Sequence, residues 1–386
     1  MVGMSSSAAP DGRLRVLHFV SGGFSGATQV AIDLARAAAR RGDAEAVLVL
    51  RRKRRMPLDR IAALRAEGLD VRMVPGWAHV ATVLALCRLC RDWRPDVLLA
   101  HGFSEHLWGR FAGLLARVPV LVHVEHNSRE RYTAWRLIQA RWLAARTAAI
   151  VGCSASVSRR LAELGFPASR IETIPNGIDF RRFQSAASLP YQQRETAIVM
   201  VARFSAQKDH LTLIEALALL RAAGLSPALY LAGSGSRRHE AAVRRRVDQL
   251  QLQDQVRFLG QHADIPGLLG RTAIAALSTH YEGMPLAVIE AMAAGCAVVA
   301  TRVSGVVDVI EDGVTGLLCP PRDARALSLA LEKLLRHRAL AQRLAQAAQD
   351  RAMFDHALET QAERYYALYM RLVNERRSPH RLKEGG

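Results

Sequence analysis

The chain has 386 residues, of which 50% are hydrophobic and 23% charged, and its formal net charge is +18. This length exceeds one ordinary core and suits two domains of roughly 180 residues. No apolar run approaches the roughly 18 residues that a membrane-spanning helix needs, and five scattered cysteines argue against a disulfide framework.

The N-terminal part begins with an alternation of strand and helix. Residues 1–12 are expected to be a flexible leader without a secretory signal. An apolar strand is expected over 14–20, and the glycine-rich turn SGGFSG leads from it into a helix over 28–41. A second strand is expected over 46–50. Strand, glycine turn, helix and strand are typical of the start of a doubly wound α/β domain.

The second strand runs into a basic segment, Arg51 to Arg55. Arg51 and Arg52 could hold the 2′-phosphate of NADP, but the preceding glycines are spaced G-G-x-x-G and not G-x-G-x-x-G. Nucleic acid is disfavoured because aromatic residues make up only 6% of the chain and no binding motif is present. An anionic membrane surface is the favoured partner, with a merely solvated arginine-rich surface as the alternative.

Three histidines stand at the ends of two further strands, expected over 96–100 and 118–124. His101 follows the first strand, His123 lies in the second, and His126 comes just after it. The carboxyl ends of strands in an open α/β sheet face the ligand crevice, although each histidine taken singly is more often structural. Earlier in this domain, Cys87 and Cys90 form a CxxC on one face of an apolar helix, which favours core packing over a zinc site.

After a polar, irregular segment at 181–195, expected to be a linker, the alternation starts again. A strand over 196–202 is followed by a loop with two cations, Arg203 and Lys208, and by a helix over 210–223. Such cations at a sheet edge suit a diphosphate, and the alternative is that they are ordinary surface cations. Further alternation continues to helices expected up to Met353, with a break at Phe354 and Asp355 before the last helix.

The stretch from Tyr281 to Gly295 follows an apolar strand at 273–277 and starts a helix. Pro285 suits the first helical turn and Gly295 a left-handed stop. Glu290 has only apolar neighbours three and four positions away, so its carboxylate needs a partner from outside the helix. Glu282 precedes a helix N-terminus, which is a ready anion site. Alternatively, Glu290 pairs with an arginine elsewhere and Glu282 is a solvated loop residue.

The segment EGMPLAVIEAMAAGCAVVAT, residues 282–301, resembles glycosyltransferase family 4, the retaining enzymes of GT-B architecture. The resemblance covers nearly the whole chain, most strongly over 196–320 and more loosely over 13–180. It implies two Rossmann-like doubly wound domains facing a cleft. Residues 13–180 would bind the acceptor and 196–353 the nucleotide sugar, with the helix at 354–377 crossing back to the first domain and a flexible tail at 378–386.

The resemblance also implies roles for individual residues. Arg203 and Lys208 would bind the donor diphosphate, Glu290 the ribose and Glu282 the hydroxyls of the transferred sugar. The remaining donor-binding residues would be those of the two backbone segments that approach the donor, namely Gly23 and Gly26 in the first turn and Gly283, Met284, Pro285 and Leu286 before the helix. His126 would lie beside the transferred sugar, with His123 on the same face to orient it and His101 as a lesser candidate.

The predicted function is therefore transfer of a hexosyl unit, with retention, from a nucleoside-diphosphate sugar to a saccharide or lipid-linked acceptor in bacterial cell-surface polysaccharide or glycolipid synthesis. The leaving diphosphate would help to deprotonate the acceptor hydroxyl, with no metal and no cofactor. The protein is expected in the cytoplasm, at the inner face of the membrane. Alternatives are a GT-B epimerase or phosphorylase, an NADP-binding oxidoreductase, and a binding protein that has lost catalysis.

Overall fold

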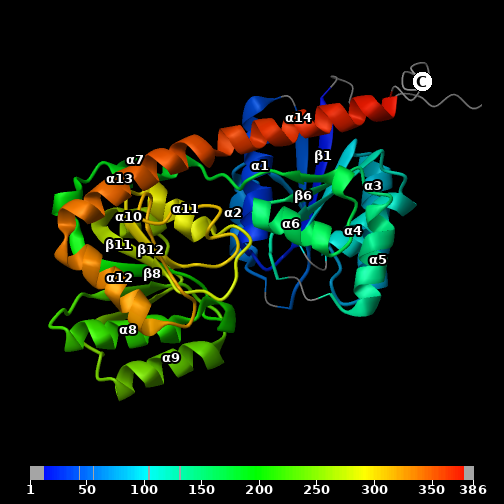
Figure 1. Ribbon diagram of the computed structural model, residues 1–386. Helices are drawn as coiled ribbons and strands as arrows, with labels where there is room; N and C mark the ends of the chain where they lie inside the picture. Colours follow the sequence, from blue (N-terminus) through cyan, green and yellow to red (C-terminus); the bar gives the residue numbers. More distant parts are fainter. Residues whose placement is uncertain (1–12, 43, 55, 103–104, 130–131, 378–386) are drawn as a thin grey trace, which may run out of the picture. The chain divides into compact units, whose positions relative to one another are not determined.

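The computed structural model describes residues 13–42, 44–54, 56–102, 105–129 and 132–377, so the predicted leader (1–12) and tail (378–386) lie outside the described residues. The chain divides into two compact units (Figure 1). Unit 1 extends to Asn176 and resumes at Leu358, and unit 2 comprises Gly177–Ala357. The last helix of the chain therefore belongs to the same unit as the first.

Unit 1 is built on a seven-stranded parallel sheet in the order β3-β2-β1-β4-β5-β6-β7. Its strands are β1 Leu14–Ser21, β2 Ala44–Arg51, β3 Asp70–Val74, β4 Val97–His101, β5 Val120–Glu125, β6 Ala149–Gly152 and β7 Ile171–Thr173. Its helices are α1 Gly26–Arg41, α2 Leu58–Ala66, α3 His79–Trp93, α4 Glu105–Leu115, α5 Ala134–Ala144, α6 Ala155–Glu163 and α14 Leu358–Arg377, with the short 3₁₀ turn η1 Ala168–Arg170.

The central strands of this sheet are apolar on both faces because helices cover both. Val16, Leu17, Phe19 and Val20 of β1 are all buried. Leu17 and Phe19 pack with α3, while Val20 packs with α1 and α2. Such near-continuous apolar runs are typical of buried parallel strands, which is why the strands were predictable from composition.

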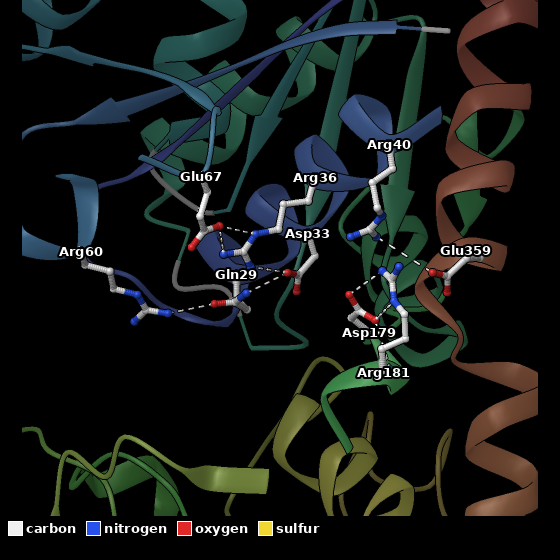
Figure 2. Close-up of polar contacts among 9 residues, drawn as sticks. All are labelled: Gln29, Asp33, Arg36, Arg40, Arg60, Glu67, Asp179, Arg181 and Glu359. Carbon is white, nitrogen blue, oxygen red and sulfur yellow. Dashed lines mark hydrogen bonds and ion pairs between the residues drawn. The ribbon is translucent and has the colours of Figure 1, made fainter. Parts of the chain in front are cut away.

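Helix α1 is held by ion pairs on its exposed side (Figure 2). Arg36 pairs with Asp33 on the same helix at 3.3 Å and with Glu67 at 2.6 Å. One turn further on, Arg40 reaches Glu359 of α14 at 4.0 Å. Asp33 is buried, whereas the pairs to Glu67 and Glu359 are exposed and stabilise little individually. The buried faces of α1 and α14 supply the main contact between the two helices.

Unit 2 repeats the architecture with a six-stranded parallel sheet in the order β10-β9-β8-β11-β12-β13. The strands are β8 Glu195–Val201, β9 Leu229–Ala232, β10 Val256–Gly260, β11 Thr272–Leu277, β12 Ala297–Thr301 and β13 Leu317–Cys319. The helices are α7 Gln184–Ala187, α8 His210–Ala222, α9 Arg237–Gln249, α10 Ile265–Arg271, α11 Leu286–Ala293, α12 Ala324–Arg336 and α13 Arg338–Asp355, with 3₁₀ turns η2 Phe180–Phe183, η3 Tyr191–Gln193 and η4 Ala206–Lys208.

Two features of unit 2 differ from the sequence predictions. The segment 181–195 is not irregular: it forms short helical turns, buries Phe183, and its Tyr191 hydroxyl donates to the carbonyl of Ala273 at 3.1 Å. The break before the last helix lies at His356 and Ala357, because α13 continues to Asp355. There the amide of Ile178 donates to the His356 carbonyl at 2.9 Å, a pairing with a distant segment that local sequence could not reveal.

Candidate functional site

Each sheet reverses its strand order at one point, between β1 and β4 in unit 1 and between β8 and β11 in unit 2. Open parallel α/β sheets bind ligands beyond the carboxyl ends of the strands at such switch points. The loops that leave these four strands carry most of the residues singled out from the sequence.

In unit 2 the switch point brings Lys208 and Glu282 together. Lys208 ends η4 after β8, and Glu282 lies in the loop after β11. The Lys208 Nζ donates to Glu282 Oε1 at 2.6 Å, and the side chains are 14% and 8% exposed. The Thr279 hydroxyl donates to the same oxygen at 2.8 Å. The alternative that Glu282 is a solvated loop residue is therefore wrong.

The two loops are joined by hydrogen bonds beneath this ion pair. The Gln207 carbonyl accepts from the backbone amide of His280 at 2.9 Å and from the Thr279 hydroxyl at 3.0 Å. The Gln207 side-chain amide donates to the carbonyl of Tyr281 at 2.7 Å. Thr301, at the end of β12, accepts from the Thr279 amide and donates to its carbonyl. The sequence analysis missed Gln207, Thr279 and Thr301, whose neutral side chains carry no strong signal.

Arg203 lies on the same loop as Lys208, with its side chain exposed. Its backbone is held against the turn that follows β9. A Cβ on Gly233 would lie 2.1 Å from the carbonyl oxygen of Ala202, and one on Gly235 would lie 2.5 Å from that of Phe204. Glycine at both positions lets the two turns touch, so the direction from which Arg203 leaves the sheet is fixed.

The helix α11 begins just after Glu282, at Leu286. Pro285 is its N-cap in an extended conformation, one residue before the helical position predicted for it, and it still leaves no amide unsatisfied there. Gly295 adopts the predicted left-handed conformation, with φ of 76°. Glu290 is half-buried in the second turn of the helix.

A glycine that the sequence analysis did not single out supports this loop. Gly305 has φ of 79°, and a Cβ there would lie 2.2 Å from the carbonyl oxygen of Gly283 and 2.7 Å from that of Glu282. The backbone after β12 therefore packs directly against the segment that carries Glu282. Gly283 and Met284 are buried in consequence.

In unit 1 the turn after β1 exposes backbone next to a helix N-terminus. Gly23 and Gly26 are exposed, and Gly26 begins the 16-residue helix α1. Gly22 is instead buried, and a Cβ on it would lie 2.7 Å from the Arg51 carbonyl oxygen. Gly22 thus serves packing, whereas Gly23 and Gly26 present the backbone groups that an anion could approach.

The histidines of unit 1 form a chain that differs from the predicted arrangement. His126 Nε2 lies 3.1 Å from His101 Nδ1, and His101 Nε2 lies 3.1 Å from Nδ1 of His18 on β1. Burial lowers the pKa of His18 and of His126 to about 4, and it also holds the pKa of His101 well below its usual range. His101 therefore orients His126, and the predicted role of His123 was wrong.

His123 points into a different cluster because successive residues of a strand face opposite sides. Its ring stacks on His106 at 4.1 Å, and its Nε2 lies 3.5 Å from Glu125 Oε2. The other carboxylate oxygen, Oε1 of Glu125, accepts from the backbone amides of His126 and Asn127 at 2.8 and 3.2 Å. Glu125, which the sequence analysis did not select, thus fixes the backbone that carries His126.

The remaining sequence predictions concern cysteines and the basic run. Cys87 and Cys90 are free thiols buried in α3, and burial raises the pKa of Cys90 to about 12, so the predicted core packing is confirmed. Arg51 pairs with Glu105 at 3.7 Å inside unit 1.

Among the described residues, no group of three or more His, Cys, Asp or Glu side chains could hold a metal ion. No described helix is long and apolar enough to cross a membrane.

Comparison with known protein families gives two matches that together span most of the chain. The model described as "Glycosyltransferase Family 4" matches residues 24–182. The model described as "Glycosyl transferases group 1" matches residues 182–351, which include Arg203, Lys208, Glu282 and Glu290.

Individual proteins agree with these matches. A glycogen synthase of Mycobacterium tuberculosis is 31% identical over 323 residues, covering 79% of this chain and 76% of the relative. The Escherichia coli UDP-Gal:alpha-D-GlcNAc-diphosphoundecaprenol alpha-1,3-galactosyltransferase is 25% identical over 66% of this chain and 70% of its own. Among solved structures, HepE of Anabaena in complex with UDP and glucose has a TM-score of 0.80 at 22% identity, over 93% of this chain and 100% of that one.

Proposed function

Because the chain belongs to the family 4 glycosyltransferases, a retaining family, we propose that it transfers a hexosyl unit from a nucleoside-diphosphate sugar to a saccharide or lipid-linked acceptor. The family assignment supports glycosyl transfer over the oxidoreductase, epimerase and phosphorylase alternatives. The proposal concerns the donor class, the acceptor class and the residues that act on them.

The observation that carries this proposal is the ion pair between Lys208 and Glu282 at the switch point of unit 2. A cation and a carboxylate 2.6 Å apart, both little exposed, form a site with two adjacent and opposite charges. A diphosphate requires the cation and a neighbouring sugar hydroxyl requires the carboxylate as acceptor. On donor binding, Lys208 would transfer its hydrogen bonds in part to the phosphate, and Glu282 would accept from the sugar.

Three further groups in unit 2 complete the assignment. Arg203 is exposed on the loop that also carries Lys208, where its planar fork suits a phosphate. The segment Gly283–Leu286 precedes the N-terminus of α11, whose amides and dipole favour negative charge. Glu290, in the second turn, is assigned to the ribose hydroxyls. In the transition state these groups stabilise the charge that develops on the leaving diphosphate.

In unit 1 we assign Gly23 and Gly26 to the diphosphate and transferred sugar of the donor, and His126 to the transferred sugar. The backbone at Gly23 and Gly26 is exposed beside the N-terminus of α1. The depressed pKa of His126 keeps its imidazole neutral at pH 7, so that it can exchange hydrogen bonds with sugar hydroxyls without adding charge. The leaving diphosphate, rather than a side chain, would take up the acceptor proton.

The acceptor class is supported by the relatives. One is named for transfer to a diphosphoundecaprenol-linked sugar and another as a glycogen synthase. A lipid-linked saccharide and a free glucan are thus the two acceptors to test first. Bacterial cell-surface polysaccharide or glycolipid synthesis, at the inner face of the membrane, is the setting that we propose.

Donor binding is best tested by thermal shift against UDP-, GDP- and ADP-sugars in the presence of EDTA. One nucleotide sugar should raise the melting temperature, and Glu290→Ala should weaken that shift by about tenfold in apparent Kd, as expected when a charge-assisted hydrogen bond is lost. Transfer products should keep the donor's anomeric configuration by NMR. If none of the nucleotide sugars shifts the protein while NADPH does, the proposal is wrong.

A further inference from the structure

All five tryptophans of the chain lie on, or just before, the three consecutive helices α3, α4 and α5 of unit 1. Trp77, just before α3, is 84% exposed, and on α5 Trp135 and Trp142 are 67% and 48% exposed. Trp108 of α4 is half-buried. Only Trp93 is part of the core. Large aromatic side chains are rarely left in water in such numbers without an interaction to serve.

Ring contacts connect two of these tryptophans, Trp108 and Trp142, across the helices. His79 of α3 stacks on Trp108 at 4.2 Å, Trp108 contacts Phe111 at 6.3 Å, and Phe111 stacks on Trp142 at 6.0 Å. The helices α3, α4 and α5 lie together in unit 1 (Figure 1). We call the exposed side of these three helices that carries Trp77, Trp108, Trp135 and Trp142 the tryptophan face. The same three helices also expose the aliphatic side chains of Val80, Leu84, Leu115 and Ile138.

The charges that surround the tryptophan face are mainly positive. Helix α5 carries Arg136 and Arg141 and no acidic residue. Just after it, the Arg146 guanidinium lies 3.8 Å from the centroid of the Trp142 ring. On α3, Arg91 is exposed. Arginine next to tryptophan suits a partner that is anionic at its surface and apolar beneath.

The basic run after β2 extends this surface toward the glycine turn. A Cβ on Gly76 would lie 1.7 Å from the carbonyl oxygen of Arg52. The basic segment therefore packs against Gly76, which immediately precedes Trp77. Lys53 Nζ lies 3.4 Å from the corresponding position on Gly23. Exposed cations at 52–54 therefore lie between the tryptophan face and the glycine turn that we assign to the donor.

We propose that the tryptophan face docks unit 1 on the surface of an anionic membrane. Tryptophan and tyrosine favour the membrane–water boundary, where the ring is partly buried and its N–H stays wet. Arginines beside it gain attraction to anionic headgroups. An apolar strip flanked by cations matches this boundary better than it matches the interior of a protein–protein interface, where charged residues are depleted at the centre.

Docking on a membrane would bring the enzyme to a lipid-linked acceptor. This connection rests on the proposed function. A membrane seated on the tryptophan face also meets the basic run, and Lys53 of that run lies beside Gly23. An acceptor headgroup in that membrane would thus be presented next to the glycine turn. Docking itself requires neither donor nor acceptor, so it can be measured separately from transfer.

The direct test is flotation of the full chain with vesicles of phosphatidylcholine containing 30 mol% phosphatidylglycerol, and with pure phosphatidylcholine vesicles, at about 0.1 M salt. We expect binding to the anionic vesicles and at least tenfold weaker partition to the neutral ones. With dibrominated acyl chains, tryptophan fluorescence should be strongly quenched. Trp93, buried in the core, should supply a residual unquenched emission.

Two pairs of variants assign the binding to the tryptophan face. Trp77→Ser with Trp135→Ser should lower the partition coefficient by about tenfold or more, because two exposed aromatic anchors are removed. Arg136→Gln with Arg146→Gln should lower it by about fivefold per arginine. The matched controls lie in unit 2: Phe354→Ser, at a side chain also 84% exposed, and Arg238→Gln with Arg245→Gln on α9 should change neither value.

Three outcomes would overturn the proposal. The first is that the protein does not bind anionic vesicles. The second is that the double tryptophan variant binds them as well as the wild type does. The third is that the chain self-associates and the double tryptophan variant does not, which would make the tryptophan face a protein–protein interface. The donor-induced thermal shift should be the same in the face variants and the wild type. If no nucleotide sugar binds while vesicle binding still depends on the tryptophans, the proposed function fails and the docking surface stands.

Discussion

Lys208 and Glu282 are 74 residues apart in sequence, and their side chains meet because β8 and β11 are neighbours in the sheet of unit 2. Two charges that are only 14% and 8% exposed lose hydration on folding, and their mutual attraction offsets that loss. The ion pair is therefore present in the absence of donor. Its net contribution to the free energy of unfolding is small. A donor that supplies its own charges to both groups can replace it.

Variants of this ion pair should change the free energy of unfolding and the rate of transfer independently. Lys208→Ala should abolish transfer and lower the free energy of unfolding by about 3 kcal/mol, because it leaves a buried carboxylate without its cation. Lys208→Met combined with Glu282→Gln should recover most of that stability and no activity. Chemical unfolding and donor-dependent product formation, measured on the same preparations, check both halves. Wild-type rates in the Lys208→Ala variant would refute the assigned role on the diphosphate.

At the scale of residues, the sequence identified the candidate side chains more reliably than it predicted their contacts. Glu282 and Lys208 stood out as charges beside an apolar strand and a strand exit, yet the distance between them depends on strand order. His123 was expected to orient His126, whereas His101 does so because β4 pairs with β5 and places His101 beside Val124. Neutral supports such as Thr279 had no distinguishing pattern at all.

At the scale of elements, the loop that carries Glu282 is held by the close approach of Gly305. Gly305→Ala should displace the Glu282–Gly283 backbone, because the new Cβ would lie 2.2 Å from a carbonyl oxygen at a φ of 79°. Gly313 has nearly the same φ, 78°, and open space around it. Gly313→Ala therefore measures the backbone cost alone, about 1 kcal/mol.

Isothermal titration of both glycine variants with the donor gives the comparison. We expect Gly305→Ala to weaken donor binding by about tenfold or more, since even small displacements of a positioned group are costly. Gly313→Ala should bind as the wild type does. Equal donor affinity in the two variants would show that Gly305 supports the fold but not the site.

Elements with continuous apolar runs were predicted close to their observed bounds, because parallel strands covered on both faces need no polar residue. The helix α2 and the strand β3 were missed: both are short, charged residues interrupt their apolar positions, and only Ile61 and Leu64 of α2 are buried. The segment 181–195 was misjudged for a similar reason. Its buried positions, such as Phe183 and Tyr191, are separated by polar residues and are packed by partners far along the chain.

At the scale of the whole molecule, the GT-B fold implied by the family resemblance is confirmed. The likeness to HepE covers 93% of this chain at a TM-score of 0.80, although only 22% of the residues are identical. The two units differ in how many imidazoles they bury, since unit 2 buries those of His210 and His356. Unit 1 buries the imidazoles of His18, His101, His106 and His123, with His126 half-buried beside them. These rings make the stability of unit 1 depend on pH.

The sign follows from the pKa values. Burial lowers the pKa of His18, His123 and His126 to about 4, from about 6.5 in the unfolded chain. Between pH 6.5 and 4 the unfolded state therefore binds protons that the folded state refuses, and acidification favours unfolding. Each fully buried ring should contribute a slope of roughly 1 kcal/mol per pH unit in this window and none above it.

Tryptophan fluorescence measures this effect selectively, because all five tryptophans of the chain belong to unit 1. In urea titrations followed by this signal, the unfolding midpoint should stay constant from pH 8 to 7 and fall steadily from pH 6.5 to 4.5. His18→Phe removes one titrating ring while keeping an aromatic side chain in the apolar surroundings of Val16, Tyr365 and Tyr369. The pH dependence of the unfolding free energy should then correspond to about one proton fewer taken up on unfolding. A midpoint that is the same at pH 7 and pH 5 would mean that these imidazoles are protonated in the folded protein.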